Sequence, residues 1–122
     1  MSQPFTGYLI PADATKPMRR VELSGDVSDI SNTINATYFD CLAVRPDVDF
    51  FVDDEALLVE SPQFNARASL LYDWEMGRQR GFAVGAQIFG DVLVTGGVDN
   101  EGSTVSISNE RVAEYTTFLT DC

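Results

Sequence analysis

The clearest periodic signal in the chain is an alternation of apolar and acidic residues near its middle. The apolar positions are Val48, Phe50 and Val52, and they alternate with Asp47, Asp49 and Phe51. A period of two is typical of a β-strand with one face buried and one face in water. The stretch therefore predicts a half-buried strand whose acids are solvated.

Other short apolar or alternating runs, each bounded by turn-forming residues, predict further strands. They are 8–10, 19–23, 39–44, 88–94 and 104–107. The first two are expected to be neighbours around a polar loop. A Gly90-Asp91 interruption predicts a bulge in the run 88–94. The run 56–60 could return as the second arm of a hairpin with the central strand.

Apolar spacings of three and four predict helices. Val27, Ile30 and Ile34 predict one over about 26–37, with Asp26 as its N-cap. Asn65 is expected to cap a second helix over about 66–77. Its predicted apolar stripe is Ala66, Leu70, Trp74 and Gly77, with Ala68 and Leu71 beside it.

A last helix is expected to start at Ser108 or Asn109. Its predicted buried stripe is Val112, Tyr115 and Leu119, with Phe118 alongside. Strands and helices are mixed along the chain without a regular βαβ alternation. The fold class expected is therefore α+β. Residues 1–122 form a single domain with a mainly antiparallel sheet of about five to six short strands and two to three helices.

Composition changes the picture chiefly by what it removes. The chain has 19 acidic and 8 basic residues, a formal charge of −11, and no histidine. Catalytic arrangements that need histidine are therefore excluded. The basic footprint expected for nucleic-acid binding is reversed in sign, and Lys16 is the one lysine.

The cysteines and the N-terminus indicate a cytoplasmic protein. Cys41 and Cys122 lie far apart in sequence, and the chain starts with neither a basic segment nor an apolar one. Free thiols in a reducing cytoplasm are expected. Cys41 has no base near it in sequence and is interpreted as a buried structural residue.

The densest acidic stretch, 47–55, begins like a calcium-binding loop, with Asp47 and Asp49 in a D-x-D pattern. Phe51 then occupies a ligand position, and Val52 stands where such a loop needs glycine. The bidentate glutamate is also missing, because position 58 is Leu58. An EF-hand is therefore rejected, while a looser carboxylate site for a divalent cation stays open.

A glycine-rich stretch and nearby arginines offer weaker signals. Gly81 and Gly85 lack the order of a phosphate-binding loop and predict a turn. Arg67, Arg78 and Arg80 could form a local basic spot. Pairing of these arginines with Asp73 and Glu75 on the same helix is the favoured interpretation.

Several segments, taken in order, resemble a family of small proteins from actinobacteria and their phages that is known only as a domain of unknown function. The matching segments are 9–13, 17–23, 50–55, 65–69 and 90–96. The resemblance runs from about residue 8 to residue 97. It implies a cytoplasmic accessory protein, often phage-borne, and supplies no catalytic residues.

These observations favour a non-enzymatic, protein-binding accessory or regulatory protein, plausibly phage-encoded and acting on a host protein. The predicted contact residues are Asp47, Asp49, Asp53 and Asp54. On a strand, Asp47 and Asp49 would share one face about 6.6 Å apart. The expected partner is a host or cognate protein with a basic surface, without direct contact with nucleic acid or membrane. No cofactor, metal or catalytic residue is expected.

Two alternatives from other classes stay open. One is an acidic nucleic-acid mimic that inhibits a restriction or DNA-handling enzyme. The other is a divalent-metal-binding protein or small enzyme that uses carboxylates alone. The sequence leaves the oligomeric state open.

Overall fold

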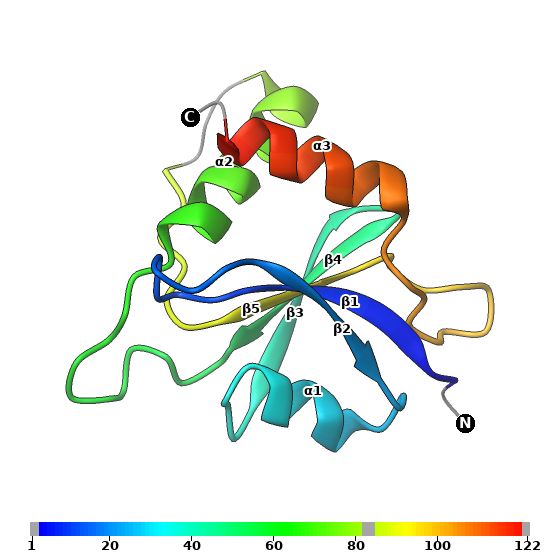
Figure 1. Ribbon diagram of the computed structural model, residues 1–122, viewed down its shortest axis with the longest axis horizontal. Helices are drawn as coiled ribbons and strands as arrows, with labels where there is room; N and C mark the ends of the chain where they lie inside the picture. The colour runs from blue at the N-terminus through cyan, green and yellow to red at the C-terminus, as the bar shows by residue number, and fades with distance from the viewer. Residues whose placement is uncertain (1–2, 82–84, 121–122) are drawn as a thin grey trace.

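The computed structural model describes residues 3–81 and 85–120. One five-stranded sheet has the spatial order β2-β1-β5-β4-β3, and each neighbouring pair is antiparallel (Figure 1). The strands are β1 (Phe5–Ile10), β2 (Arg19–Leu23), β3 (Phe39–Arg45), β4 (Val48–Asp53) and β5 (Val92–Thr95). The helices are α1 (Val27–Thr33), α2 (Ala66–Arg80) and α3 (Asn109–Thr120). The predicted α+β class with an antiparallel sheet is confirmed.

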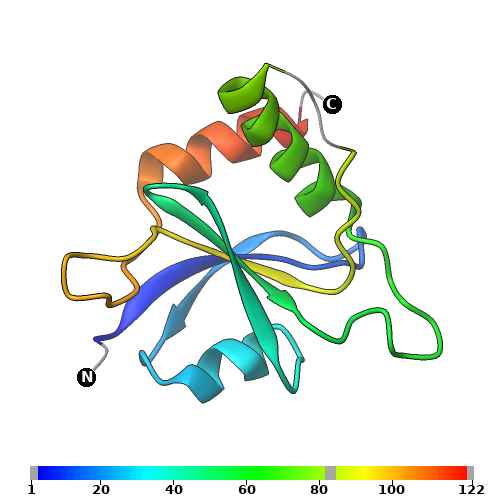
Figure 2. The same cartoon turned by 180° about the vertical axis from the view of Figure 1, so that it is seen from behind.

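The sheet is covered on both faces. Helices α2 and α3 pack on one face and α1 packs on the other (Figures 1 and 2). Alternate strand residues therefore enter two cores. Phe50 and Val94 lie with Leu71 and Tyr115 under α2 and α3. Phe51 packs in the second core, with α1.

The chain builds the sheet from two hairpins and one inserted strand. β1 pairs with β2, and β3 pairs with β4, each with its neighbour in sequence. β5 comes later and lies between β1 and β4, so it is the central strand and is buried throughout. Because helices cover both faces of the sheet at β5, its alternate side chains enter the two cores and its short apolar run needs no alternation.

Covering both faces also corrects the expectation for β4. The period-two pattern predicted a strand with one solvated face, but Asp49 is buried at 7% exposure. The reason is that α1 covers the face to which Asp49 and Phe51 belong. An alternating pattern is thus compatible with burial on both sides when one polar residue is enclosed.

Three predicted strand segments differ from the structure. Residues 56–60 form turns, because backbone N–H groups of Ala56 and Leu58 donate to the carbonyls of Asp53 and Glu55. The run 88–94 becomes a strand only from Val92, because Gly90 has a left-handed φ of +83°.

Residues 104–107 contribute one isolated bridge, between Thr104 and Val98. Gly96 and Gly97 bring the end of β5 against this segment. A Cβ on Gly96 would lie 2.1 Å from the carbonyl oxygen of Ser106, so only glycine fits there. The N–H of Gly96 donates to the carbonyl of Val105, and the N–H of Val105 donates to the carbonyl of Gly97.

Helix α2 is longer than predicted and buries a different face. The Asn65 side chain caps it as expected, accepting from the N–H of Ala68. The helix continues to Arg80 and ends at Gly81, which is left-handed with φ +81°. Leu70, assigned to the buried stripe, is 47% exposed. The buried face instead centres on Leu71 and Glu75.

Helix α1 is shorter than predicted. Its N-cap residue is Asp26, whose side chain makes no capping bond, and Asp29 instead accepts from the N–H of Ser24. Residue Asn35 has a positive φ of 56°, which ends helical geometry before residue 37. Helix α3 begins at Asn109 with Val112 and Tyr115 buried, as predicted, while Leu119 is half-buried.

Aspartate side chains fix many of the turns. Six aspartate side chains each accept a hydrogen bond from at least one backbone N–H group. They are Asp13, Asp29, Asp53, Asp73, Asp91 and Asp99. Six of the 19 acidic residues therefore satisfy backbone N–H donors at turns and loops.

The carboxylate of Glu75 joins the two long helices to the sheet. It is fully buried and accepts a hydrogen bond from the Tyr115 hydroxyl of α3. Guanidinium nitrogens of three arginines surround it: Arg45 at 3.5 Å, Arg78 at 3.7 Å and Arg111 at 3.8 Å. The predicted pairing of Arg78 with Glu75 is confirmed.

Neighbouring contacts extend this cluster. Arg111 also binds Glu114 at 2.9 Å. Arg78 lies 4.6 Å above the ring of Trp74, and Trp74 stacks on Phe118. Burial, together with the bond to Glu75, raises the pKa of Tyr115, which keeps its hydroxyl protonated as a donor. A buried carboxylate requires such partners, because an unpaired one costs several kcal/mol.

Replacing Tyr115 by Phe is expected to lower the free energy of unfolding by about 1.5–3 kcal/mol, the range for a hydrogen bond to a charged group. The matched control is Tyr8→Phe, which removes a bond between uncharged hydroxyls, Tyr8 to Thr116. It is expected to cost about 0.5–1.5 kcal/mol. Urea denaturation of both variants measures the difference. Equal losses would show that the Glu75 contact has no special weight.

Candidate functional site

The structure places the four predicted contact residues in three different environments. Asp47 lies in the β3–β4 turn and is paired across to α3. Its two carboxylate oxygens accept bonds of 3.1 and 3.0 Å from Arg111. These bonds hold the pKa of Asp47 below its usual range. Asp47 therefore acts in the fold as an anchor for α3.

Asp49 is enclosed on the opposite face of the sheet. Burial raises its pKa, and the thiol of Cys41 on β3 donates a hydrogen bond to it, which acts in the other direction. Cys41 itself is exposed and free, so its interpretation as a buried residue is wrong. The reason is that β3 lies at an edge of the sheet. Partial burial and the nearby Asp49 raise the pKa of the thiol to about 11.

Asp53 and Asp54 lie at the end of β4 and border a groove. Asp53 is half-buried and accepts from the N–H of Glu55, whereas Asp54 is exposed. Both residues line the groove. The structure therefore brings Asp53 and Asp54 together and separates them from Asp47 and Asp49.

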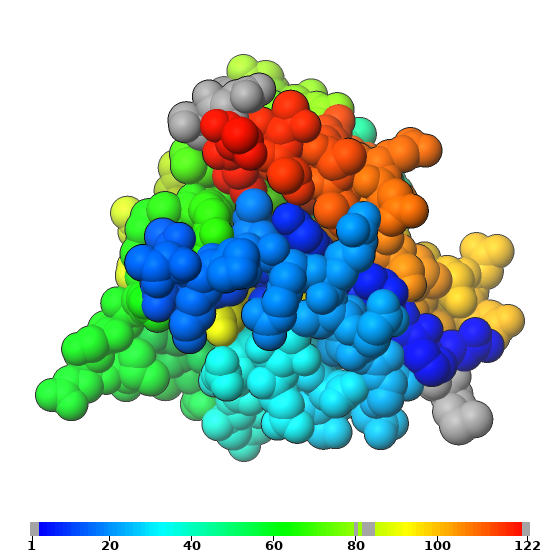
Figure 3. Space-filling view, viewed as in Figure 1, coloured from blue at the N-terminus to red at the C-terminus, as the bar shows by residue number. Residues whose placement is uncertain are grey.

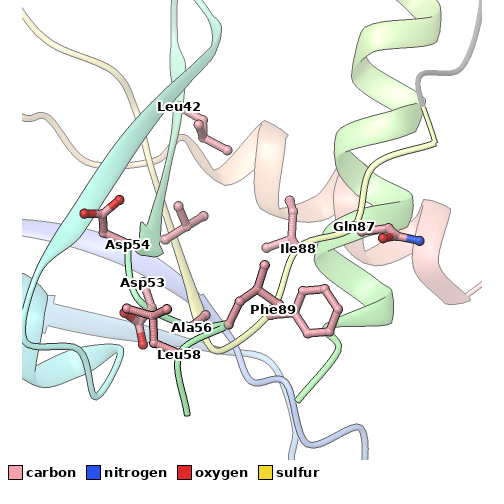
Figure 4. Close-up of a pocket in the computed structure, with 10 residues that line it drawn as sticks. Leu42, Asp53, Asp54, Ala56, Leu58, Gln87, Ile88 and Phe89 are labelled. Atoms are coloured by element: carbon pink, nitrogen blue, oxygen red, sulfur yellow. The ribbon is translucent and has the colours of Figure 1, made fainter. Parts of the chain in front are cut away.

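The groove is largely apolar and has a volume of about 430 Å³. Its apolar lining includes residues from β3, β4 and the segment that precedes β5. These residues are Leu42, Val52, Ala56, Leu57, Leu58, Ile88 and Phe89. Figure 4 shows Leu42 and Asp54 on one side, with Ile88 and Phe89 across from them. The volume falls in the range typical of sites that accept small molecules or side chains.

The loop between β4 and α2 adds exposed apolar surface beside the groove. Leu57, Leu58 and Val59 are exposed at 63%, 78% and 55%. This loop projects from the body of the molecule (green in Figures 1 and 3). Contiguous exposed apolar side chains of this kind mark interaction surfaces.

Positive charge lies elsewhere in the described chain. Arg45, Arg78 and Arg111 converge on Glu75, and none of the three lines the groove. Arg67 does not pair with Asp73 or Glu75 but donates to the backbone carbonyls of three loop residues, Pro11, Asp13 and Lys16. No basic residue lines the groove, so its rim is acidic.

Some predicted features fall outside the described residues. The turn predicted between Gly81 and Gly85 includes residues 82–84, and the side chain of Arg80 and the residue Cys122 are likewise outside. Within residues 3–81 and 85–120, no three acidic or cysteine side chains lie close enough together to hold a metal ion. In the same ranges no helix has the length and apolar character needed to cross a bilayer.

Sequence reasoning missed the apolar half of the site. Leu42, Ile88 and Phe89 come from two distant segments, and nothing in their spacing relates them. One usable signal was present: the run Leu57-Leu58-Val59 is apolar although it follows a turn and precedes Pro62. That run was interpreted as a strand, which would have buried it.

Replacing Asp49 by Asn is expected to raise the free energy of unfolding at pH 7, because burial disfavours the charged form. The raised pKa means that stability falls as pH rises from the usual value of 3.8 through the folded-state value. The gain should therefore disappear below about pH 3.8. Urea denaturation at pH values from 3 to 7, spaced about one pH unit apart, measures the difference in the free energy of unfolding between the variant and the wild type.

The control Asp47→Asn should act in the opposite direction. Its pKa is lowered by Arg111, so its stabilisation is complete above about pH 3.8 and is lost as pH falls through the folded-state value. Because Asp47 is half exposed, the expected loss at pH 7 is about 0.5–1 kcal/mol. A destabilised Asp49→Asn variant at pH 7 would contradict the assignment.

Comparison with known proteins adds one finding. No curated protein and no solved structure matches the chain. A family model described as a domain of unknown function, DUF3846, matches residues 6–120. The match includes α3, so the family extends beyond the point near residue 97 where the sequence resemblance ended. The chain belongs to the DUF3846 family.

Proposed function

We propose that this chain is a non-enzymatic accessory protein that works by binding another protein, and that the acid-rimmed apolar groove is its docking site. The proposal includes a phage-encoded origin, a cytoplasmic location and a host protein with a basic surface as the partner. The observation that carries it is the groove itself. It combines an open apolar lining, two carboxylates and no basic residue.

The arrangement of charge supports a basic partner. The groove is bordered by Asp53 and Asp54, and Glu55 and Glu60 lie on the adjoining loop. The described arginines are largely engaged in internal contacts and do not neutralise this side. Complementary charge would speed encounter and fix orientation, while the apolar groove would supply the buried contact.

The groove explains the exposed leucines better than mimicry of nucleic acid does. A mimic requires carboxylates arranged like a line of phosphates. Here many aspartates accept backbone N–H bonds in separate turns, and Asp47 and Glu75 are paired with arginines. A mimic also has no use for the apolar surface at Leu57 and Leu58.

The test is a comparison of three immobilised proteins in a lysate of cells that naturally contain the chain. Leu58→Lys adds a positive charge at the groove, and Val27→Lys adds the same charge on α1, at a residue that is 68% exposed. Proteins retained by the wild type and by Val27→Lys but reduced about tenfold with Leu58→Lys would support the proposal. Quantitative mass spectrometry measures retention at low and high salt.

Circular dichroism establishes that both variants keep the fold, since each position is exposed. A retained set that is the same for all three proteins would contradict docking at the groove. Retention that does not fall at high salt would contradict a basic partner.

A further inference from the structure

We propose that the occupant of the groove is an extended peptide segment of the partner, which pairs with β3 as a sixth strand and carries both apolar and basic side chains on the face that lies over the groove. This inference rests on the proposed function and names the binding mode and the chemistry of the partner. It depends on three observations: an open strand edge, a groove beside that edge, and the charge around both.

The outer edge of β3 is open. In the described chain β3 has a neighbour on one side, β4. Asp40, Cys41 and Ala43 are exposed along it. Figure 2 shows β3 and β4 in the foreground of the sheet, with the helices above and below them. An open edge presents unpaired N–H and C=O groups that can pair with another strand.

The register identifies which backbone groups point outward. The N–H of Asp54 donates to the carbonyl of Tyr38, which makes this facing pair a hydrogen-bonded one. In an antiparallel ladder such pairs alternate with non-bonded pairs. The backbone groups of Phe39, Cys41 and Ala43 therefore point away from β4. The shift in register after Ala43 ends this regular stretch.

The two edges of the sheet are protected to different degrees. On β2, Arg19, Arg20 and Glu22 are exposed along a five-residue strand, and Arg20 also binds Asn109 of α3. Charged side chains of this kind discourage added strands. The stretch of β3 from Phe39 to Ala43 carries one charged residue, Asp40, and no proline or lysine. β3 is therefore the edge available for pairing.

The groove lies where side chains of an added strand would project. Leu42 belongs to both β3 and the groove lining, on the sheet face under α2 and α3. Every second side chain of a strand beside β3 would extend over this same face. An apolar side chain there would contact Leu42, Leu58 and Phe89. Strand addition with alternate side chains in pockets is an established mode of peptide recognition.

Charge selects the partner. Asp40 is exposed on β3, on the same sheet face as Leu42 two residues later, and Asp54 is exposed at the groove. Lysine or arginine two residues from an apolar position of the added strand would share its face and meet these carboxylates. A second copy of this chain would bring its own Asp40 and a charge of −11 to the same edge. Like charges across a strand pair are destabilising. A basic peptide is therefore favoured over self-association.

The experiment uses the intact protein and a labelled synthetic peptide of about seven residues, in which the odd positions are valine and lysine in turn and the even positions are threonine. Two further versions carry N-methyl groups on alternate residues, one on the odd and one on the even positions. Each version keeps the charge and the side chains but removes one set of backbone donors. Fluorescence anisotropy at low salt, up to about 1 mM protein, measures binding.

Strand addition predicts that one N-methylated version binds like the parent and that the other binds at least about tenfold more weakly. It also predicts amide chemical-shift changes at Phe39, Cys41 and Ala43, and weaker binding to Leu58→Lys. A control peptide with glutamate in place of each lysine should not bind.

Four outcomes would overturn the inference. The first is equal binding of both N-methylated versions, and the second is equal binding of the glutamate peptide. The third is no binding of any peptide. The fourth is a dimer of the free protein, detected by sedimentation and dissociated by the peptide, which would make a second copy the occupant. None of these outcomes overturns the proposed function, because that depends on retention of a partner by the wild type and its loss with Leu58→Lys.

Discussion

The carboxylate of Glu75 determines how the two long helices lie on the sheet. It is fully buried, so it needs the Tyr115 hydroxyl and the surrounding guanidinium groups at the same time. Those groups come from α2, α3 and β3, and Arg111 continues the connection to Asp47 in the β3–β4 turn. One end of β3 is thereby tied to both helices. The other end, near Phe39, has no such tie, and it is there that the edge and the groove are open.

Local sequence patterns predicted the elements whose residues act within one segment. The antiparallel pair β1 and β2, the strand β3, the Asn65 cap and the start of α3 all follow from short-range spacing and turn chemistry. The buried face of α2 was mispredicted because Glu75 occupies its centre. A glutamate is predicted to face solvent unless its tertiary partners are known. The partners of Glu75 lie up to 40 residues away in the sequence. The predicted length of a strand was wrong where a left-handed glycine, such as Gly90, ends the extended backbone.

The candidate site was predicted only in its acidic part. Asp53 and Asp54 do line the groove, but Asp47 and Asp49 serve other contacts. Asp47 lies in the turn before β4 and pairs with Arg111, and Asp49 is enclosed on the sheet face that α1 covers. The apolar part joins Leu42 to Ile88 and Phe89 through sheet order, because β5 inserts between β1 and β4. Spacing within a single segment carries no information about that insertion. Exposure of Leu57 and Leu58 is likewise a property of the folded surface.

The fold needs the aspartates at the turns as hydrogen-bond acceptors but does not need their charge. Their role in the fold is to accept hydrogen bonds from backbone N–H groups, and an asparagine side chain offers the same oxygen without the charge. Versions of this chain with asparagine at these six positions, and a formal charge of −5 rather than −11, are therefore physically allowed with the same topology. Acidity at those turns is free to change with the partner or the ionic surroundings, whereas Glu75 and Asp47 are held to their identity by the arginines that face them.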